Sequence, residues 1–201
     1  FLNADEYLAS QRLAELKAAL GDPELAGLNM VELGPAQLDP ARLLAEASLM
    51  PFLAERRLLI VRGYLDSLDK RMAASKLPGC AAFQEAADLL ARLPTVPDTC
   101  DLVFVDSAVD KRRGLFKGMV TSSGDAHGQA ERKLAGLESL AKSGVVQMVE
   151  LPTPDAKALP AWIQQHARAH KINIQPDAVA LLATYVGRNL RQLDNELEKL
   201  S

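Results

Sequence analysis

Short apolar runs alternate with stretches of helical periodicity over the first 150 positions, a pattern typical of an α/β sheet. Two of these runs, 57–61 and 101–105, are apolar without alternation, as expected for parallel strands that are covered on both faces. Further strands are predicted at 28–33 and 145–150, and residues 1–2 have the character of a strand end. The pattern therefore predicts a parallel sheet flanked by helices.

Helices are predicted between these strands at about 6–20, 39–50, 81–93 and 111–119. Asn3 and Glu6 have the spacing of a capping box for the first of them. Asp39 is the expected N-cap of the second, with Pro40 at its first position. The segment 121–144 begins as a Gly- and Ser-rich loop and is expected to continue as an amphipathic helix. Its apolar face carries Leu134, Leu137 and Leu140.

After residue 150 the pattern is purely helical. Pro160 and Pro176 each open a helix, and Asn189 with Gln192 forms a capping box for a last one. The apolar face of that last helix is expected to carry Leu190, Leu193, Leu197 and Leu200. We therefore expect an α/β domain over 1–150 and a small helical lid domain over 151–201.

Composition narrows the class of protein. An apolar fraction of 48% over 201 residues can fill a core, while a net charge of -3 argues against a nucleic-acid coat or a membrane-surface protein. Cys80 and Cys100 lie far apart without the spacing of a disulfide framework or a zinc site, which fits a reducing cytoplasm. No apolar run approaches the length of a membrane span.

An α/β domain followed by a helical lid suggests a nucleotide-handling ATPase, but the phosphate-binding loop is missing. A P-loop needs glycines followed by Lys and Ser or Thr, and no Gly-Lys pair occurs in the chain. Asp5 and Glu6 follow the first strand end, where they would repel phosphate. Asp106 ends the strand at 101–105, where such an ATPase holds magnesium, yet Ser107 stands in place of the activating Glu.

Other charged residues leave two interpretations open. Arg191 occupies a lid position from which an arginine reaches a γ-phosphate, or it is a solvated arginine at the start of a helix or part of an interdomain salt bridge. Lys111, Arg112 and Arg113 form a basic cluster that contacts phosphate or lies on a solvated helix face. For Asp106, simple strand termination is the competing interpretation.

No metal site and no catalytic residue are expected. His166 and His170 are one helical turn apart, but the sequence shows no third ligand or His-Glu-x-x-His pattern beside them. There is also no Gly-x-Ser-x-Gly nucleophile motif. Nucleotide-binding architecture without nucleotide chemistry indicates an interaction protein that needs no cofactor.

One apolar cluster stands where a surface connection is expected. Met50, Pro51, Phe52 and Leu53 come directly before the strand at 57–61. Either these side chains belong to the core or they contact another protein.

Four stretches together resemble a known family. They are "DEYL" at 5–8, "FLAERRLLIVRG" at 52–63, "VDKRRGLFKGM" at 109–119 and the helical stretch from "LPAWIQQHARAHK" to "LRQLDNELEKL" at 159–200. In this order they are similar to the delta subunit of bacterial DNA polymerase III, a component of the sliding-clamp loader. The resemblance spans nearly the whole chain.

The resemblance implies a fold of the AAA+ type, with a helical collar domain expected beyond residue 201. It also implies a subunit that does not hydrolyse ATP, belongs to a DNA-directed DNA polymerase holoenzyme and acts in the cytoplasm, at the replisome on the nucleoid. Its partners would be the sliding clamp, which is the polymerase beta subunit, the gamma/tau and delta prime subunits and, indirectly, primed DNA, with no membrane. The subunit would bind the clamp and hold it open.

The family also implies positions for the contacts. In it, the helix before the strand at 57–61 inserts two large apolar side chains into the clamp, and the matching positions are Phe52 and Leu53, flanked by Met50 and Pro51. The basic cluster of Lys111, Arg112 and Arg113 would contact DNA or another subunit. The alternative is a related ATPase with a degenerate nucleotide site that uses Asp106 and Arg191.

Overall fold

The structure, a computed structural model, describes residues 1–75, 80–125 and 128–200. Three parallel strands form a sheet in the order β1-β2-β3. Their bounds are β1 (Met30–Leu33), β2 (Arg57–Arg62) and β3 (Cys100–Val105). Isolated parallel bridges from Leu2 to Asp106 and to Glu150 continue the sheet beyond β3. The expected α/β class with a parallel sheet flanked by helices is confirmed.

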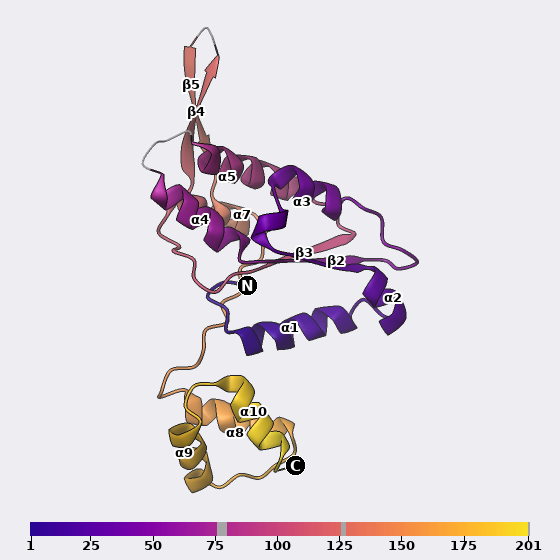
Figure 1. Ribbon diagram of the computed structural model, residues 1–201, viewed down its shortest axis with the longest axis vertical. Coiled ribbons are helices and arrows are strands. Elements are labelled where there is room, and N and C mark those ends of the chain that lie inside the picture. The colour runs from indigo at the N-terminus through magenta and orange to yellow at the C-terminus, as the bar shows by residue number, and fades with distance from the viewer. Residues whose placement is uncertain (76–79, 126–127, 201) are drawn as a thin grey trace.

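The described helices are α1 (Glu6–Ala18), α2 (Pro23–Leu28), α3 (Pro40–Ala47), α4 (Tyr64–Ala74), α5 (Ala81–Arg92), α6 (Gly114–Lys117), α7 (Leu137–Lys142), α8 (Leu159–Ala169), α9 (Pro176–Tyr185) and α10 (Leu190–Glu198), with short 3-10 turns at Pro35–Gln37 and Leu93–Thr95. In Figure 1, α3, α4 and α5 lie on one side of the sheet and α1 on the other. Within the described residues, none of these helices is both long and apolar enough to cross a membrane.

The central strand β2 explains why its sequence shows no alternation. Leu59 and Val61 pack into the cluster formed with α3, α4 and α5, whereas Leu58 and Ile60 pack against Leu13 of α1 on the opposite face. These four apolar side chains of β2 are fully buried. A strand with apolar neighbours on both faces needs apolar residues at consecutive positions.

The first helix is capped differently from the prediction. Asp5, not Asn3, is the N-cap, and its carboxylate accepts hydrogen bonds from the N–H groups of Tyr7 and Leu8. Asn3 has a positive φ of 48°, and its side chain accepts from the N–H of Val109. The capping box at Asn3 was therefore wrong, whereas the predicted caps Asp39 and Asn189 are confirmed.

The segment 121–144 is the largest departure. It contains an antiparallel hairpin of β4 (Met119–Asp125) and β5 (Gly128–Leu134), followed by the short helix α7, instead of a loop and one amphipathic helix. Gly136 lies between β5 and α7. The position requires glycine, because a Cβ there would lie 2.2 Å from the carbonyl oxygen of Phe116. Leu134 therefore belongs to a strand, while Leu137 and Leu140 belong to a helix.

Three further boundaries differ from the prediction. The helix expected at 111–119 is a single turn, α6, because the chain turns at Gly118 with a positive φ of 105° and enters β4. Residues 145–150 form only the bridge at Glu150, not a strand. Leu28 is the last residue of α2, so β1 begins at Met30 and is shorter than the predicted strand at 28–33.

The helices α8, α9 and α10 share a separate hydrophobic cluster, which α1 joins through Tyr7. Leu190, Leu193 and Leu197 of α10 are buried in it, but Leu200 lies beyond the helix and is exposed, contrary to the prediction. The division into domains at residues 150 and 151 stays a prediction.

Candidate protein-binding surface

The connection between α3 and β2 presents large apolar side chains to solvent. The exposed fractions are 84% for Met50, 56% for Phe52 and 74% for Leu53, and Pro51 between them is partly exposed. Figure 1 shows this connection reaching past the end of the sheet, beside α2. These side chains are therefore not part of the hydrophobic core, and the core interpretation of this cluster was wrong.

The cluster is not carried by a helix. The predicted helix at 39–50 ends at Ala47, with Ser48 as its C-cap, so Met50, Pro51, Phe52 and Leu53 lie in the irregular connection after it. The helix-borne contact implied by the resemblance therefore does not describe this chain. The structure instead places these apolar residues on a loop.

Leu53 combines two unfavourable features. It is largely exposed, and its φ of 50° places it in the left-handed region, which a residue with a Cβ rarely adopts. An apolar side chain that stays exposed on a strained backbone does not contribute to the stability of the free chain. Such positions cluster at binding sites, where the surrounding structure fixes them.

The side chain that fixes this connection is Asn29, which is only 2% exposed. Its Nδ2 donates to the carbonyl of Phe52 at 2.8 Å and to that of Leu25 at 2.9 Å. Its Oδ1 accepts from the N–H of Phe52 at 2.6 Å. One amide thus pairs both backbone groups of Phe52, as a neighbouring β-strand would, and fixes the backbone that carries the exposed phenyl ring.

Sequence reasoning missed Asn29 because it was included in the predicted strand at 28–33. It is instead the C-cap of α2, directly before β1. The signal that could have found it is an amide side chain between the two apolar residues Leu28 and Met30. A buried asparagine needs several hydrogen-bond partners, and the nearby connection supplies them.

The other end of the sheet holds Asp106, where the sequence suggested a nucleotide site. Asp106 follows β3, and its fully buried carboxylate accepts from the N–H of Asp66 in the first turn of α4 at 2.9 Å. Its second oxygen, Oδ2, has no hydrogen-bond partner among the described residues. Burial raises the pKa of Asp106 to about 6, against the opposing effect of the Asp66 N–H. This geometry fits a carboxylate that caps a helix.

Arg191 lies on α10, where its guanidinium is 3.8 Å from the carboxylate of Glu6 in α1. Both side chains are largely exposed. Asp106 and Arg191, the two expected nucleotide-site residues, therefore have different polar partners in the structure.

The three side chains of the predicted basic cluster are each paired with a carboxylate. Lys111 contacts Glu150, and Arg112 contacts Asp110. Arg113 donates to the buried carboxylate of Asp69 at 2.8 Å. The neighbouring arginines lower the pKa of Asp110 to about 2, with the Arg112 hydrogen bond as the main cause. The cluster is thus largely neutralised by its own surroundings.

Comparison with known proteins places this fold in one structural class. The fold, a parallel sheet flanked by helices with a helical part after it, resembles that of a DNA clamp loader delta protein. A solved structure that it resembles is the Bacillus subtilis DNA clamp loader delta protein (YqeN), with a TM-score of 0.66 over 99% of this chain. The two sequences are 18% identical, and this chain covers 51% of that protein, about half its length. No family model and no curated protein matches the sequence.

Proposed function

We propose that this chain is the clamp-binding, non-hydrolysing delta subunit of a bacterial DNA clamp loader. The observation that carries the proposal is the exposed apolar connection at Met50, Pro51, Phe52 and Leu53, held by Asn29, on a fold similar to a clamp loader delta protein. Phe52 and Leu53 are the anchors that enter a hydrophobic pocket of the sliding clamp. A few large apolar residues in a pocket can supply most of the binding energy of an interface.

The proposal assigns the chain no catalytic residue. Its partners are the sliding clamp and the other loader subunits, gamma/tau and delta prime, and its place is the cytoplasmic replisome. A contact of Lys111, Arg112 and Arg113 with DNA or a subunit is the weakest part of the proposal, because a phosphate would have to displace carboxylates that already pair with these side chains.

The alternative is a related ATPase with a degenerate nucleotide site at Asp106 and Arg191. It has less support, because the Asp106 carboxylate is fully buried and already caps α4, while Arg191 lies beside Glu6. A nucleotide that binds the folded chain would raise its melting temperature. We expect ATP with magnesium to leave the melting temperature unchanged.

The test of the proposal is calorimetric titration of this chain with a bacterial sliding clamp. We expect the Phe52→Ala, Leu53→Ala double variant to lose about 2 kcal/mol or more of binding free energy, which is roughly 30-fold in Kd. Because both side chains are exposed, the variant should keep the circular dichroism spectrum of the parent.

A matched control removes apolar surface elsewhere. Leu181 and Tyr185 on α9 are exposed to 56% and 84%, so the Leu181→Ala, Tyr185→Ala double variant loses comparable surface outside the proposed anchor. It should bind the clamp like the parent chain. Equal loss in both double variants, or none in either, would move the contact away from Phe52 and Leu53, and absence of binding by the parent chain would overturn the proposal.

A further inference from the structure

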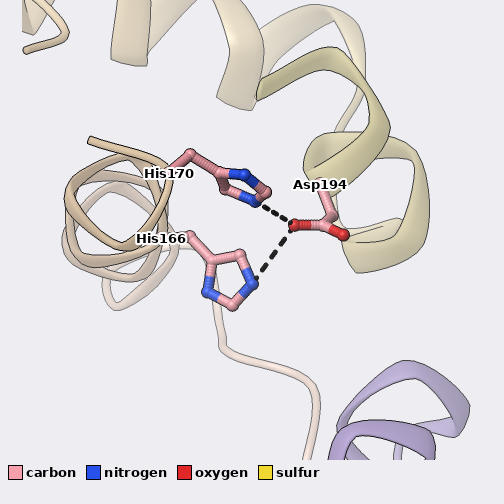
Figure 2. A group of neighbouring side chains, drawn as sticks. All are labelled: His166, His170 and Asp194. Carbon is pink, nitrogen blue, oxygen red and sulfur yellow. Dashed lines mark hydrogen bonds and ion pairs between the residues drawn. The ribbon is translucent and has the colours of Figure 1, made fainter. Parts of the chain in front are cut away.

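Two histidines and one aspartate converge where the sequence offered only the histidines. His166 and His170 lie one turn apart on α8, and Asp194 of α10 faces both of them (Figure 2). The Nε2 atoms of His170 and His166 are 2.8 Å and 3.4 Å from the same oxygen, Oδ1 of Asp194. One potential ligand atom from each of the three residues lies within 4.8 Å of the others.

We propose that His166, His170 and Asp194 form a binding site for a divalent transition metal ion of the zinc class. In a tetrahedral zinc site with bonds of about 2.0–2.1 Å, neighbouring ligand atoms are roughly 3.3 Å apart. The two distances from Asp194 Oδ1 bracket that value. The ligand atoms of the two histidines lie within 4.8 Å of each other, so side-chain rotation can bring all three ligands around one ion. Two imidazoles and one carboxylate select zinc, cobalt, nickel or copper over magnesium and calcium, which prefer oxygen ligands.

The hydrogen bonds around His166 are compatible with the tautomer that a metal ligand needs. Gln11 donates to the Tyr7 hydroxyl at 2.6 Å, and the Tyr7 oxygen lies 2.7 Å from His166 Nε2 and also forms a hydrogen bond with Asp194. In the tautomer in which His166 carries its proton on Nδ1, Nε2 is an acceptor to which Tyr7 can donate. A metal ion at Nε2 would replace the hydrogen bond from Tyr7.

On His170 the Nε2 atom donates to Asp194, so its proton must move to Nδ1 when the metal binds. The side chain is 27% exposed and Asp194 is 23% exposed, so solvent can mediate this exchange and can supply a fourth ligand. Catalytic and other open zinc sites have three protein ligands and a water molecule in the same way. The ion would join α8 to α10, and it would weaken the hydrogen bond that holds Tyr7 of α1 to this helical part.

The signal for Asp194 is present in the sequence. It lies four residues after Leu190 and three before Leu197, both buried, and therefore points to the same side of α10 that packs on α8. A carboxylate on an otherwise apolar face is the observation that identifies the third ligand.

The test is calorimetric titration of the chain, without a histidine tag and freed of metal by a chelator, with zinc chloride. We expect one ion to bind per chain and the melting temperature to rise with zinc concentration. His170→Gln and Asp194→Asn should each weaken zinc binding at least 10- to 100-fold, the loss that even supporting residues cause in established sites.

Two control variants distinguish the loss of a zinc ligand from the effect of changing a neighbouring residue. Asp177→Asn replaces an exposed carboxylate on α9 and should bind zinc like the parent. Tyr7→Phe keeps all three ligands and removes the competing hydrogen bond to His166, so it should bind zinc at least as tightly as the parent.

Nuclear magnetic resonance of the parent chain provides a measurement that needs no variant. The chain has three histidines, and zinc should shift the ring nitrogen resonances of two of them, His166 and His170. Absence of zinc binding, binding that survives both ligand substitutions, or ring shifts outside this pair would each overturn the site. Any of these outcomes would leave the three residues as a hydrogen-bond network between α8 and α10.

Discussion

The two ends of the parallel sheet differ in which side chains they expose and which they bury. At the end where the strands begin, apolar side chains stay exposed on a connection that Asn29 holds in place. At the end where the strands finish, about 20 Å away for strands of this length, Asp106 is buried as a helix cap and the basic cluster is paired with carboxylates. At the end where the strands finish, most charged side chains are paired within the chain, although Oδ2 of Asp106 has no hydrogen-bond partner among the described residues. At the end where the strands begin, large apolar side chains are left exposed.

The comparison teaches where a partner can gain free energy. A partner that binds at the end where the strands finish would have to break existing ion pairs and hydrogen bonds. The free energy lost with them would offset most of the free energy gained from new polar contacts. Binding at the starting end would bury apolar surface that is exposed in the free chain. This difference supports the proposed contact at the connection before β2, and not at the other end of the sheet, where the sequence suggested a nucleotide site at Asp106.

The largest effect is expected from Asn29→Ala. The substitution removes three hydrogen bonds from a buried amide, and we expect the free energy of unfolding to fall by about 3 kcal/mol in urea denaturation. Asn173→Ala, at an exposed position, is the control and should have little effect. A loss no larger than the control's would show that Asn29 does not hold the connection.

The pH dependence of stability should report on Asp106. Its pKa of about 6 in the folded chain lies above the ordinary value of 3.8 for an aspartate, so the folded state holds this proton more tightly than the unfolded state does. Its contribution is fully present below about pH 4 and is lost as the pH rises through 6, a decrease of about 2 kcal/mol between pH 4 and 6.

The Asp106→Asn variant removes this titration while its amide oxygen can still accept from Asp66. Urea unfolding of both proteins from pH 4 to 7 should show the variant gaining stability relative to the parent as the pH rises. Parallel curves for the two proteins would contradict a raised pKa at this position.

Within the basic cluster, two neighbouring arginines should differ. Arg113→Ala leaves the carboxylate of Asp69, which is 4% exposed, without its partner, and we expect a loss of about 1 to 2 kcal/mol because the arginine itself is half-exposed. Arg112→Ala removes a side chain that is 88% exposed and should cause no measurable change in urea unfolding. Equal effects would mean that burial of Asp69 does not matter.

The smallest effect is expected at Leu53. Glycine adopts a positive φ without the clash of a Cβ, so Leu53→Gly should stabilise the free chain by up to about 1 kcal/mol while it weakens clamp binding. Lys171→Gly, at a φ of 62°, is the control that should change stability alone. A Leu53→Gly variant that is no more stable than the parent would argue against strain at this position.

The sequence predicted those parts of the fold that local patterns determine. The strands β2 and β3 and the caps Asp39 and Asn189 depend on neighbouring residues, and each is confirmed. The hairpin was missed because Leu134, Leu137 and Leu140 have helical spacing, while the decisive contact is the close approach of Gly136 to Phe116.

The site was predictable only in part, for the same reason. The unusual run of apolar residues at 50–53 is visible in the sequence, but the side chain that orders it is 23 residues away from Phe52. Asp194 is likewise 24 residues from His170. Contacts of this kind depend on how the elements pack, which a local pattern does not contain.

The pairing of Asn29 with Phe52 also has a kinetic consequence. A connection that is already ordered before it meets its partner needs no rearrangement during the encounter, so the association rate should be set by diffusion and orientation. Substitutions of Phe52 or Leu53 should then shorten the lifetime of a complex and leave its rate of formation nearly constant. Release of the connection by Asn29→Ala should instead slow the encounter itself, because the loop must find its bound shape each time.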